Sequence, residues 1–231
     1  MNDNLDLTLY PESSELVLAT ATELLEIINI KLRENDECHI ALTGGTLGVE
    51  LMEKLIGFFN SIDDLTGLHI WFSDERFAPI DSDLRNALAI HKKLKNKTID
   101  VHQVLGLQAG VTVHDAADSY NAELSNVTMD VCVLGLGPDA HVASLFPAAW
   151  SSDENRRAIA ITDSPKPPLE RVTFSMNFIN SSEQVWIIAA GEAKSTAVSQ
   201  VLEMDLSVPA AHAMGSELTR LIIDSEAFSV D

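Results

Sequence analysis

Residues 131–147 read Val-Cys-Val-Leu-Gly-Leu-Gly-Pro-Asp-Ala-His-Val-Ala-Ser-Leu-Phe-Pro, and this stretch decides the fold. Its first four residues form an unbroken apolar run, which is typical of a strand buried on both faces of a parallel sheet. The two glycines and the proline that follow end this strand abruptly. The residues after them therefore lie at the carboxyl end of a central strand, where open α/β sheets bind their ligands.

Asp139 and His141 occupy that position. A histidine two residues after an aspartate, on a sharp turn at the end of a strand, is a candidate proton-transfer group. The alternative is a loop histidine that only hydrogen-bonds its neighbours. Residues 135–140 also match the G-x-G-x-x-G/A dinucleotide fingerprint. That fingerprint requires a long helix directly after the glycines, whereas Phe146-Pro147 cuts the next segment to about one turn. A nicotinamide-dependent dehydrogenase is therefore disfavoured.

The rest of the chain alternates between strand and helix patterns about five times. Helices are expected over residues 10–33, 47–59, 86–97, 113–124 and 191–203. Strands are expected over residues 38–42, 68–72, 101–107, 158–161, 184–190 and 221–224, with a further element beginning at residue 171. This order predicts a doubly wound α/β fold: a mainly parallel, Rossmann-like sheet in three layers, with helices on both faces and room for a small additional lobe. We expect residues 1–231 to form a single domain.

Composition narrows the possible partners. The chain has 15 basic and 35 acidic residues and a net charge of −20. Nucleic acid is therefore an unfavourable partner, because binding it requires a basic face. The longest apolar runs are too short to span a membrane, and the N-terminal residues lack the pattern of a signal peptide. Cys38 and Cys132 fall in predicted buried strands and are interpreted as core residues, so a cytoplasmic location is expected.

Four predicted strand exits carry groups suited to an anionic ligand. They are Gly44-Gly45-Thr46, Arg76, the His141 loop and Lys194. Because the exits of parallel strands share one edge, these groups predict a pocket for a phosphorylated small molecule. Backbone N–H groups of a glycine turn before a helix can bind phosphate, although four residues fit a tight turn without a ligand equally well. The lysine-rich segment at residues 91–97 is interpreted as a solvated helix face.

The chain resembles the bacterial 6-phosphogluconolactonases of the glucosamine-6-phosphate isomerase/lactonase superfamily over nearly its whole length. The resemblance is carried, in order, by Leu42-Thr43-Gly44-Gly45-Thr46, Trp71-Phe72-Ser73-Asp74-Glu75-Arg76, residues 134–147, Arg171-Val172-Thr173 and Gly191-Glu192-Ala193-Lys194. It implies hydrolysis of 6-phosphoglucono-δ-lactone in the pentose phosphate pathway without a metal or cofactor. It further implies a phosphorylated sugar lactone as the small-molecule partner, and a monomer or small homo-oligomer.

The resemblance also assigns roles by position. His141 would activate the attacking water, and Asp139 could orient its imidazole. A second set of residues would bind the substrate and its phosphate: Gly44, Gly45, Thr46, Arg76, Arg171 and Lys194. The resemblance places Arg171 beside the substrate without giving it a definite role.

Two positions depart from the family pattern. Ala140 stands where the family usually has glycine, so it would be strained if that position needs a positive φ. Arg85 stands before Asn86 where the family commonly has serine, and it could either add a cation near the substrate or face solvent.

The sequence also has to be weighed against two rival functions. Glucosamine-6-phosphate deaminase shares the glycine turn and the histidine loop. The deaminase, however, has a sequence like Asp-Glu-Tyr at the segment after the second strand, and a sequence like Ala-Phe-Asn-Glu-Pro after the histidine. Here those positions read Asp74-Glu75-Arg76 and Ala143-Ser144-Leu145-Phe146-Pro147. A non-catalytic sugar-phosphate-binding protein is the other rival, and Ala140 is its only support.

Overall fold

The computed structural model of the protein describes residues 5–148, 150–151 and 154–228. Its centre is a seven-stranded sheet in the order β1-β10-β9-β6-β2-β3-β5, in which every neighbouring pair is parallel. The strands are β1 (Leu5–Tyr10), β2 (Cys38–Leu42), β3 (Leu68–Phe72), β5 (Asp100–Val101), β6 (Val131–Gly135), β9 (Gln184–Ala189) and β10 (Leu218–Asp224). The predicted parallel sheet is confirmed.

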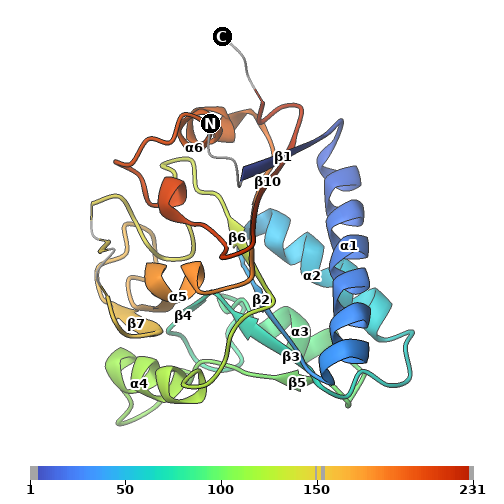
Figure 1. Ribbon diagram of the computed structural model, residues 1–231. Coiled ribbons are helices and arrows are strands. Elements are labelled where there is room, and N and C mark those ends of the chain that lie inside the picture. The colour runs from blue at the N-terminus through green and yellow to red at the C-terminus, as the bar shows by residue number, and fades with distance from the viewer. Residues whose placement is uncertain (1–4, 149, 152–153, 229–231) are drawn as a thin grey trace.

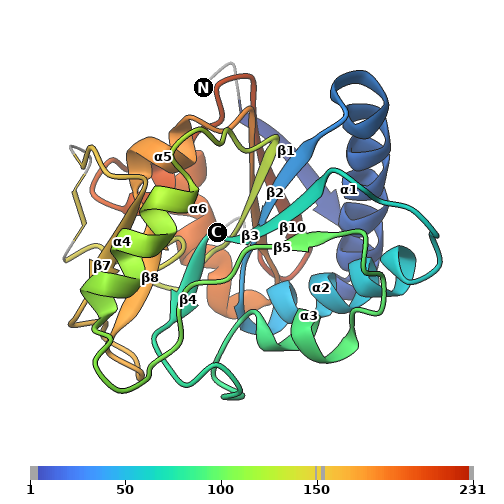
Figure 2. The same ribbon diagram turned by 90° about the horizontal axis from the view of Figure 1, so that it is seen from below.

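Helices cover both faces of this sheet, as predicted (Figures 1 and 2). They are α1 (Ser13–Asn35), α2 (Gly45–Phe59), α3 (Leu88–Lys93), α4 (Val113–Glu123), α5 (Met176–Asn180) and α6 (Ser195–Leu202), with 3₁₀ turns η1 (Glu192–Lys194) and η2 (Pro209–His212). Two apolar cores result, because successive side chains of a strand point to opposite faces. On β6, Val131 and Val133 join the core under α1 and α2, while Cys132 and Leu134 join the core under α4 and α6.

A second, smaller sheet packs on one side of the molecule. It contains β4 (Asp74–Arg76), β8 (Arg171–Phe174) and β7 (Ala158–Ile161) in the order β4-β8-β7, and both pairs are antiparallel. The sequence pattern predicted room for a small lobe but treated residues 73–76 as a loop at the exit of β3. The strand forms because residues 74–76 pair in register with residues 171–173.

Several predicted boundaries were wrong. The helix expected over residues 86–97 is limited to Leu88–Lys93, and the strand expected over residues 101–107 is limited to Asp100–Val101. The strand β1 was not predicted at all. It lies at the edge of the sheet, where Leu7 and Leu9 are exposed, so it lacks the fully apolar pattern that marks the central strands.

The chain reverses its direction across the sheet between β2 and β6. From β2 it proceeds to β3 and β5 on one side, and from β6 to β9 and β10 on the other. Ligands of open α/β sheets bind at such a switch point, outside the carboxyl ends of the strands. The glycine turn follows β2 and the histidine loop follows β6, so the fold brings the two predicted segments together.

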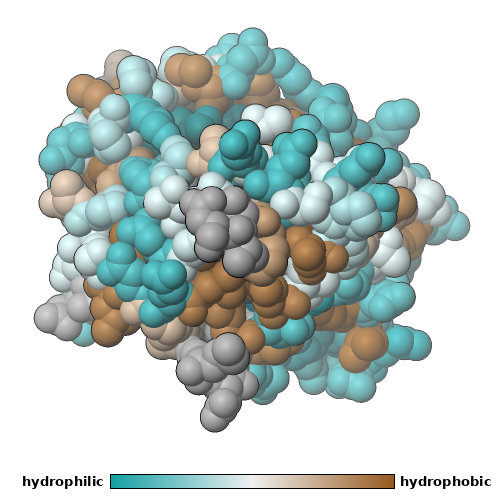
Figure 3. All heavy atoms as spheres, turned by 90° about the horizontal axis from the view of Figure 1, so that it is seen from above, coloured by the Kyte–Doolittle hydropathy of each residue, from teal (hydrophilic) through white to brown (hydrophobic). Residues whose placement is uncertain are grey.

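The surface at the end of the molecule where β6 and β10 finish is mixed in character. Hydrophilic side chains dominate this face, and a smaller apolar area lies beside them (Figure 3). Within the described residues, no helix combines the length and apolar character needed to cross a membrane.

Candidate active site

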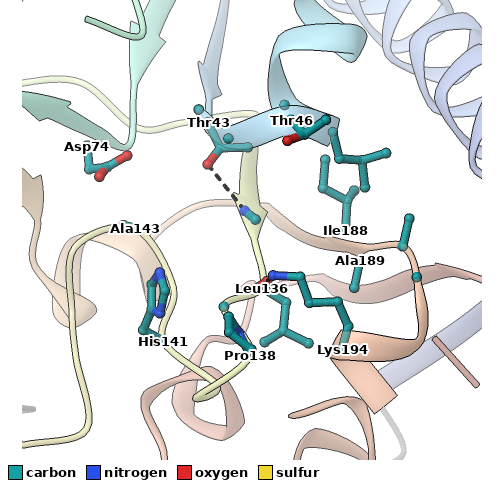
Figure 4. Close-up of a pocket in the computed structure, with 18 of the residues that line it drawn as sticks. Thr43, Thr46, Asp74, Leu136, Pro138, His141, Ala143, Ile188, Ala189 and Lys194 are labelled. Carbon is teal, nitrogen blue, oxygen red and sulfur yellow. Dashed lines mark hydrogen bonds between the residues drawn. The ribbon is translucent and has the colours of Figure 1, made fainter. Parts of the chain in front are cut away.

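A cleft of about 640 Å³ lies at the switch point. Its lining includes residues of the β2–α2 turn, β4, the loop after β6, the 166–171 segment, the end of β9 and η1. All the site residues predicted from the sequence line it except Asp139, which contacts His141 from the same loop. Figure 4 shows His141 on one side of the cleft, Thr43 and Thr46 at the start of α2, and Lys194 across from the histidine.

The imidazole of His141 has a fixed tautomer. Its Nδ1 forms a short hydrogen bond with Asp139 Oδ1, and an ionised carboxylate can only accept, so Nδ1 carries the hydrogen. Nε2 is therefore the basic atom. Burial lowers the pKa of His141 below its ordinary value; the hydrogen bond with Asp139 opposes this shift, and the charge of Lys166 adds to it. The imidazole is consequently neutral near pH 7, as a general base requires.

Asp139 is adapted to orient this histidine. Burial alone would raise the pKa of its carboxyl, but the hydrogen bond and charge of His141 reverse that effect, and the pKa lies below its ordinary value. The aspartate therefore remains ionised and holds the imidazole through Nδ1. The ring of His141 also contacts Phe146, with ring centroids 4.5 Å apart.

The loop around His141 depends on unusual backbone geometry. A Cβ on Gly137 would lie 1.9 Å from His141 Nδ1 and 2.7 Å from Asp139 Oδ1, so glycine is required for the imidazole to approach the backbone. The chain on either side of Gly137 forms isolated bridges, Leu136 with Val142 and Val142 with Leu145, and no helix begins directly after the glycines in this described part of the chain. The dinucleotide fingerprint is therefore not followed by the helix that it requires.

Ala140 adopts the left-handed conformation that its family position suggested, with a φ of 56°. It is buried, its N–H donates to Gly137 O at 3.0 Å, and its carbonyl accepts from Ala210 N at 3.1 Å. These backbone hydrogen bonds therefore hold Ala140 in a conformation that glycine would adopt without strain.

Ala140→Gly should raise the free energy of unfolding by about 0.5–1 kcal/mol. Relief of the left-handed strain outweighs the larger backbone entropy that glycine brings to the unfolded chain. Urea unfolding of the two proteins measures the difference. A glycine variant less stable than the native protein would show that Ala140 is not strained.

The start of α2 is open to an anion. Gly44 is its N-cap and provides no side-chain cap, and the first turn contains no acidic residue. The free N–H groups and the helix dipole there favour negative charge. Gly45 has a φ of 76°, and a Cβ on Gly44 would lie 2.0 Å from Asn86 Oδ1, so both glycines are required by the geometry of the turn.

Four cationic side chains line the cleft: those of Arg76, Lys166, Arg171 and Lys194. Four carboxylates line it as well, those of Glu50, Asp74, Asp224 and Glu226. Lys194 Nζ donates to Leu136 O at 2.6 Å. Burial lowers the pKa of Lys194, the charge of Lys166 lowers it further, and the charge of Asp139 opposes this shift. An anion bound beside Lys194 would favour its charged form.

Arg171, whose role was left open, mainly organises the wall of the cleft. Its Nη2 donates to Lys166 O at 2.9 Å and its Nε to Pro168 O at 3.2 Å. Nη1 lies 3.9 Å from Asp74 Oδ2, which accepts a hydrogen bond from Ser144 Oγ at 2.6 Å. Arg171 therefore fixes the segment that carries Lys166 relative to the histidine loop.

Lys166 and Gly137 were not predicted as site residues. Lys166 belongs to a proline-rich stretch, Pro165-Lys166-Pro167-Pro168, whose composition indicates only a stiff connection. Gly137 was interpreted only as ending the strand. Only the position of these two residues in the sequence could have indicated a role, because each lies within or beside a segment that resembles the family.

Comparison with known proteins agrees with the fold. Residues 11–222 match the family model described as glucosamine-6-phosphate isomerases/6-phosphogluconolactonase. The 6-phosphogluconolactonase of Mycobacterium leprae is 31% identical, and the alignment covers 95% of each protein. That of Streptomyces coelicolor is 32% identical over 99% of this chain and 95% of the relative. The crystal structure of 6-phosphogluconolactonase from Thermotoga maritima superimposes with a TM-score of 0.81 at 25% identity, covering 96% of this chain and 100% of the other. The chain therefore belongs to the glucosamine-6-phosphate isomerase/6-phosphogluconolactonase family.

Proposed function

We propose that this chain hydrolyses 6-phosphoglucono-δ-lactone to 6-phosphogluconate in the oxidative branch of the pentose phosphate pathway. The observation that carries the proposal is His141, whose Nδ1 is bound to Asp139 so that Nε2 is the basic atom, in a cleft lined by an uncapped helix N-terminus and by cations. A base beside an anion site suits a substrate that carries both a lactone and a phosphate.

The proposed reaction requires one base and one water molecule. Nε2 of His141 takes a proton as the water oxygen bonds to the lactone carbonyl carbon. The tetrahedral intermediate then collapses, the bond from that carbon to the ring oxygen breaks, and the imidazolium returns its proton to the ring oxygen. Ionised Asp139 stabilises the imidazolium through Nδ1. The lactone is an activated ester, so this route requires no covalent enzyme intermediate, metal or cofactor.

The phosphate would be held apart from the reacting carbon. Its proposed ligands are the backbone N–H groups of Gly44, Gly45 and Thr46 together with the side chains of Arg76 and Lys194. Lys166 extends the cationic lining toward His141, as its effect on the pKa of the imidazole indicates. Long-range repulsion from a chain of net charge −20 must be overcome by such directed, short-range donors. Anchoring of the phosphate would align the lactone with the base.

The proposal also includes the expectations from the sequence about domain organisation, cellular location and oligomeric state. We infer a single domain, a cytoplasmic location, and a monomer or small homo-oligomer. The substrate is a small phosphorylated sugar lactone, and the acidic surface disfavours nucleic acid.

The test is acid release from freshly generated 6-phosphoglucono-δ-lactone, followed at constant pH with and without the purified protein. We expect hydrolysis well above the spontaneous rate. Ammonium release from glucosamine-6-phosphate, measured in parallel, distinguishes the deaminase activity of the same family. A rate equal to that of buffer alone would refute the lactonase assignment, and ammonium release without lactone hydrolysis would replace it.

A further inference from the structure

Arg85 is a buried cation next to the cleft. Its side chain has no exposed surface, and its Nε lies 3.7 Å from Glu75 Oε2, whose side chain is also fully buried. Nη2 donates to Val104 O at 2.5 Å and Nη1 to Ala78 O at 3.4 Å. The solvent-facing role considered from the sequence is therefore wrong. Arg85 does not line the cleft at His141; it lines a neighbouring pocket that shares Gly45, Thr46 and Arg76 with that cleft.

Its partner Glu75 binds the ends of the loop between β4 and α3, which Figure 2 shows at the edge of the molecule. Oε1 accepts from Arg76 N at 2.8 Å and from Asn86 N at 2.7 Å. Oε2 accepts from Ala87 N at 2.9 Å and faces Arg85. Donors therefore approach both oxygens, which favours the ionised carboxylate.

Arg85 supplies the charge that makes this ionised state tolerable. Burial holds the pKa of Glu75 above its ordinary value, and the charge of Arg85 is the largest effect that opposes this rise. Without the guanidinium, the carboxylate would be a buried and uncompensated charge, which is strongly unfavourable. Glu75 would then take up a proton more readily and lose acceptor capacity for its backbone donors.

The chain segment held in this way contacts the proposed phosphate site. The carbonyl of Leu84, directly before Arg85, accepts from Arg76 Nη1 at 2.7 Å. Asn86, directly after it, donates through Nδ2 to Asp74 O at 2.8 Å and packs against Gly44 of the glycine turn. Both neighbours of Arg85 thus orient a group that lines the cleft.

We propose that Arg85 is a positioning residue for phosphate recognition. It acts through Glu75, whose ionised carboxylate fixes the backbone of Arg76 and of residues 86–87, and it does not touch the substrate. This inference rests on the proposed lactonase function and extends it to a residue at which this chain departs from the family pattern.

The test is the selectivity ratio, kcat/KM for 6-phosphoglucono-δ-lactone divided by kcat/KM for unphosphorylated glucono-δ-lactone, in Arg85→Ser and Arg85→Lys. Arg85→Ser should lower the ratio roughly tenfold, mainly through a higher KM for the phosphorylated lactone, because a loosened Arg76 and glycine turn bind only the phosphate less well. Arg85→Lys should retain most of the ratio, since it keeps the charge. In Arg85→Ser the KM should also rise more steeply on acidification than in the native protein, because loss of the guanidinium raises the pKa of Glu75 further.

Arg220→Ser is the matched control. Arg220 is also largely buried and ion-paired, with Nε 3.5 Å from Asp6 Oδ2, but it does not line the cleft. This variant should lose stability and keep the native ratio. If Arg85→Ser does not fold, the paired variant Glu75→Gln/Arg85→Gln removes both charges together and should still lower the ratio, because an amide oxygen accepts fewer of the backbone donors.

Two results would overturn the role of Arg85: a native ratio in Arg85→Ser, or a ratio in Arg85→Lys that falls as far as the ratio in Arg85→Ser. Hydrolysis of the phosphorylated lactone by the native protein tests the proposed function separately. If that turnover is absent, calorimetric binding of 6-phosphogluconate decides the inference. Arg85→Ser should then bind it about tenfold more weakly than native protein and Arg220→Ser, and equal affinities would refute the positioning role.

Discussion

Replacing His141 with alanine is expected to lower kcat for the phosphorylated lactone by roughly 10²–10⁴ while KM changes little. The imidazole is the group with a basic nitrogen beside the proposed lactone site, and its loss removes proton transfer without removing the phosphate ligands. The measurement is steady-state hydrolysis at pH 7, corrected for the spontaneous reaction. The variant keeps the other polar groups of the cleft, among them Asp74 and Lys194, which Figure 4 shows on other sides of it.

The pH dependence provides the control for this prediction. Burial lowers the pKa of His141, so the native kcat/KM should fall on acidification with an apparent pKa below the ordinary histidine value of about 6.5. That acid limb should be absent from the residual activity of His141→Ala. Native-like turnover in the variant, or the same acid limb in both proteins, would remove His141 from the mechanism.

Replacing Gly137 with alanine should be nearly as damaging, with a fall in kcat of roughly 10²-fold. The new methyl group would lie 1.9 Å from His141 Nδ1, which is impossible without displacement of the imidazole or of its loop. A base displaced by about 1 Å is no longer aligned with the attacking water and the carbonyl carbon of the lactone. Steady-state kinetics of the variant, together with its unfolding free energy, separate misplacement from loss of fold.

Gly57→Ala is the matched control for this substitution. Gly57 lies within α2, and a Cβ there would meet no atom within 4 Å. It should retain native turnover and gain about 0.5–1 kcal/mol of stability, because alanine favours a helix interior over glycine. Equal kinetics in the two variants would mean that the close approach of Gly137 to His141 is not functionally important.

The central strands were predictable because their sequences are apolar on both faces. β2 and β3 have the predicted boundaries, and β6 extends one residue further. Strand β1 alternates apolar and polar residues, which is a strand pattern that the prediction missed. Its partner β10 lies more than 200 residues away, so its place at the edge of the sheet could not be read from local sequence. The second sheet depends equally on a distant pairing, between residues 74–76 and 171–173.

The candidate site was predictable where it follows strand exits and less so where tertiary contacts create it. His141 and the glycine turn meet because β6 and β2 are neighbours at the switch point. Lys166 reaches the cleft from an irregular segment that Arg171 holds, and nothing in the local pattern indicates that contact. Arg85 is charged and was expected near substrate or solvent, whereas burial beside Glu75 depends on residues 75–87 folding back on themselves.

Selection of a phosphorylated lactone is the central property that we propose for this cleft. Its most direct test is kcat/KM of the native protein and of Arg76→Ala for 6-phosphoglucono-δ-lactone and for glucono-δ-lactone, each corrected for spontaneous hydrolysis. The native protein should prefer the phosphorylated lactone by at least about 10²-fold, since a charge-assisted phosphate site contributes several hydrogen bonds of about 1.5–3 kcal/mol each. Arg76→Ala should lose much of that preference through a higher KM. Equal native efficiency on both lactones would contradict the account.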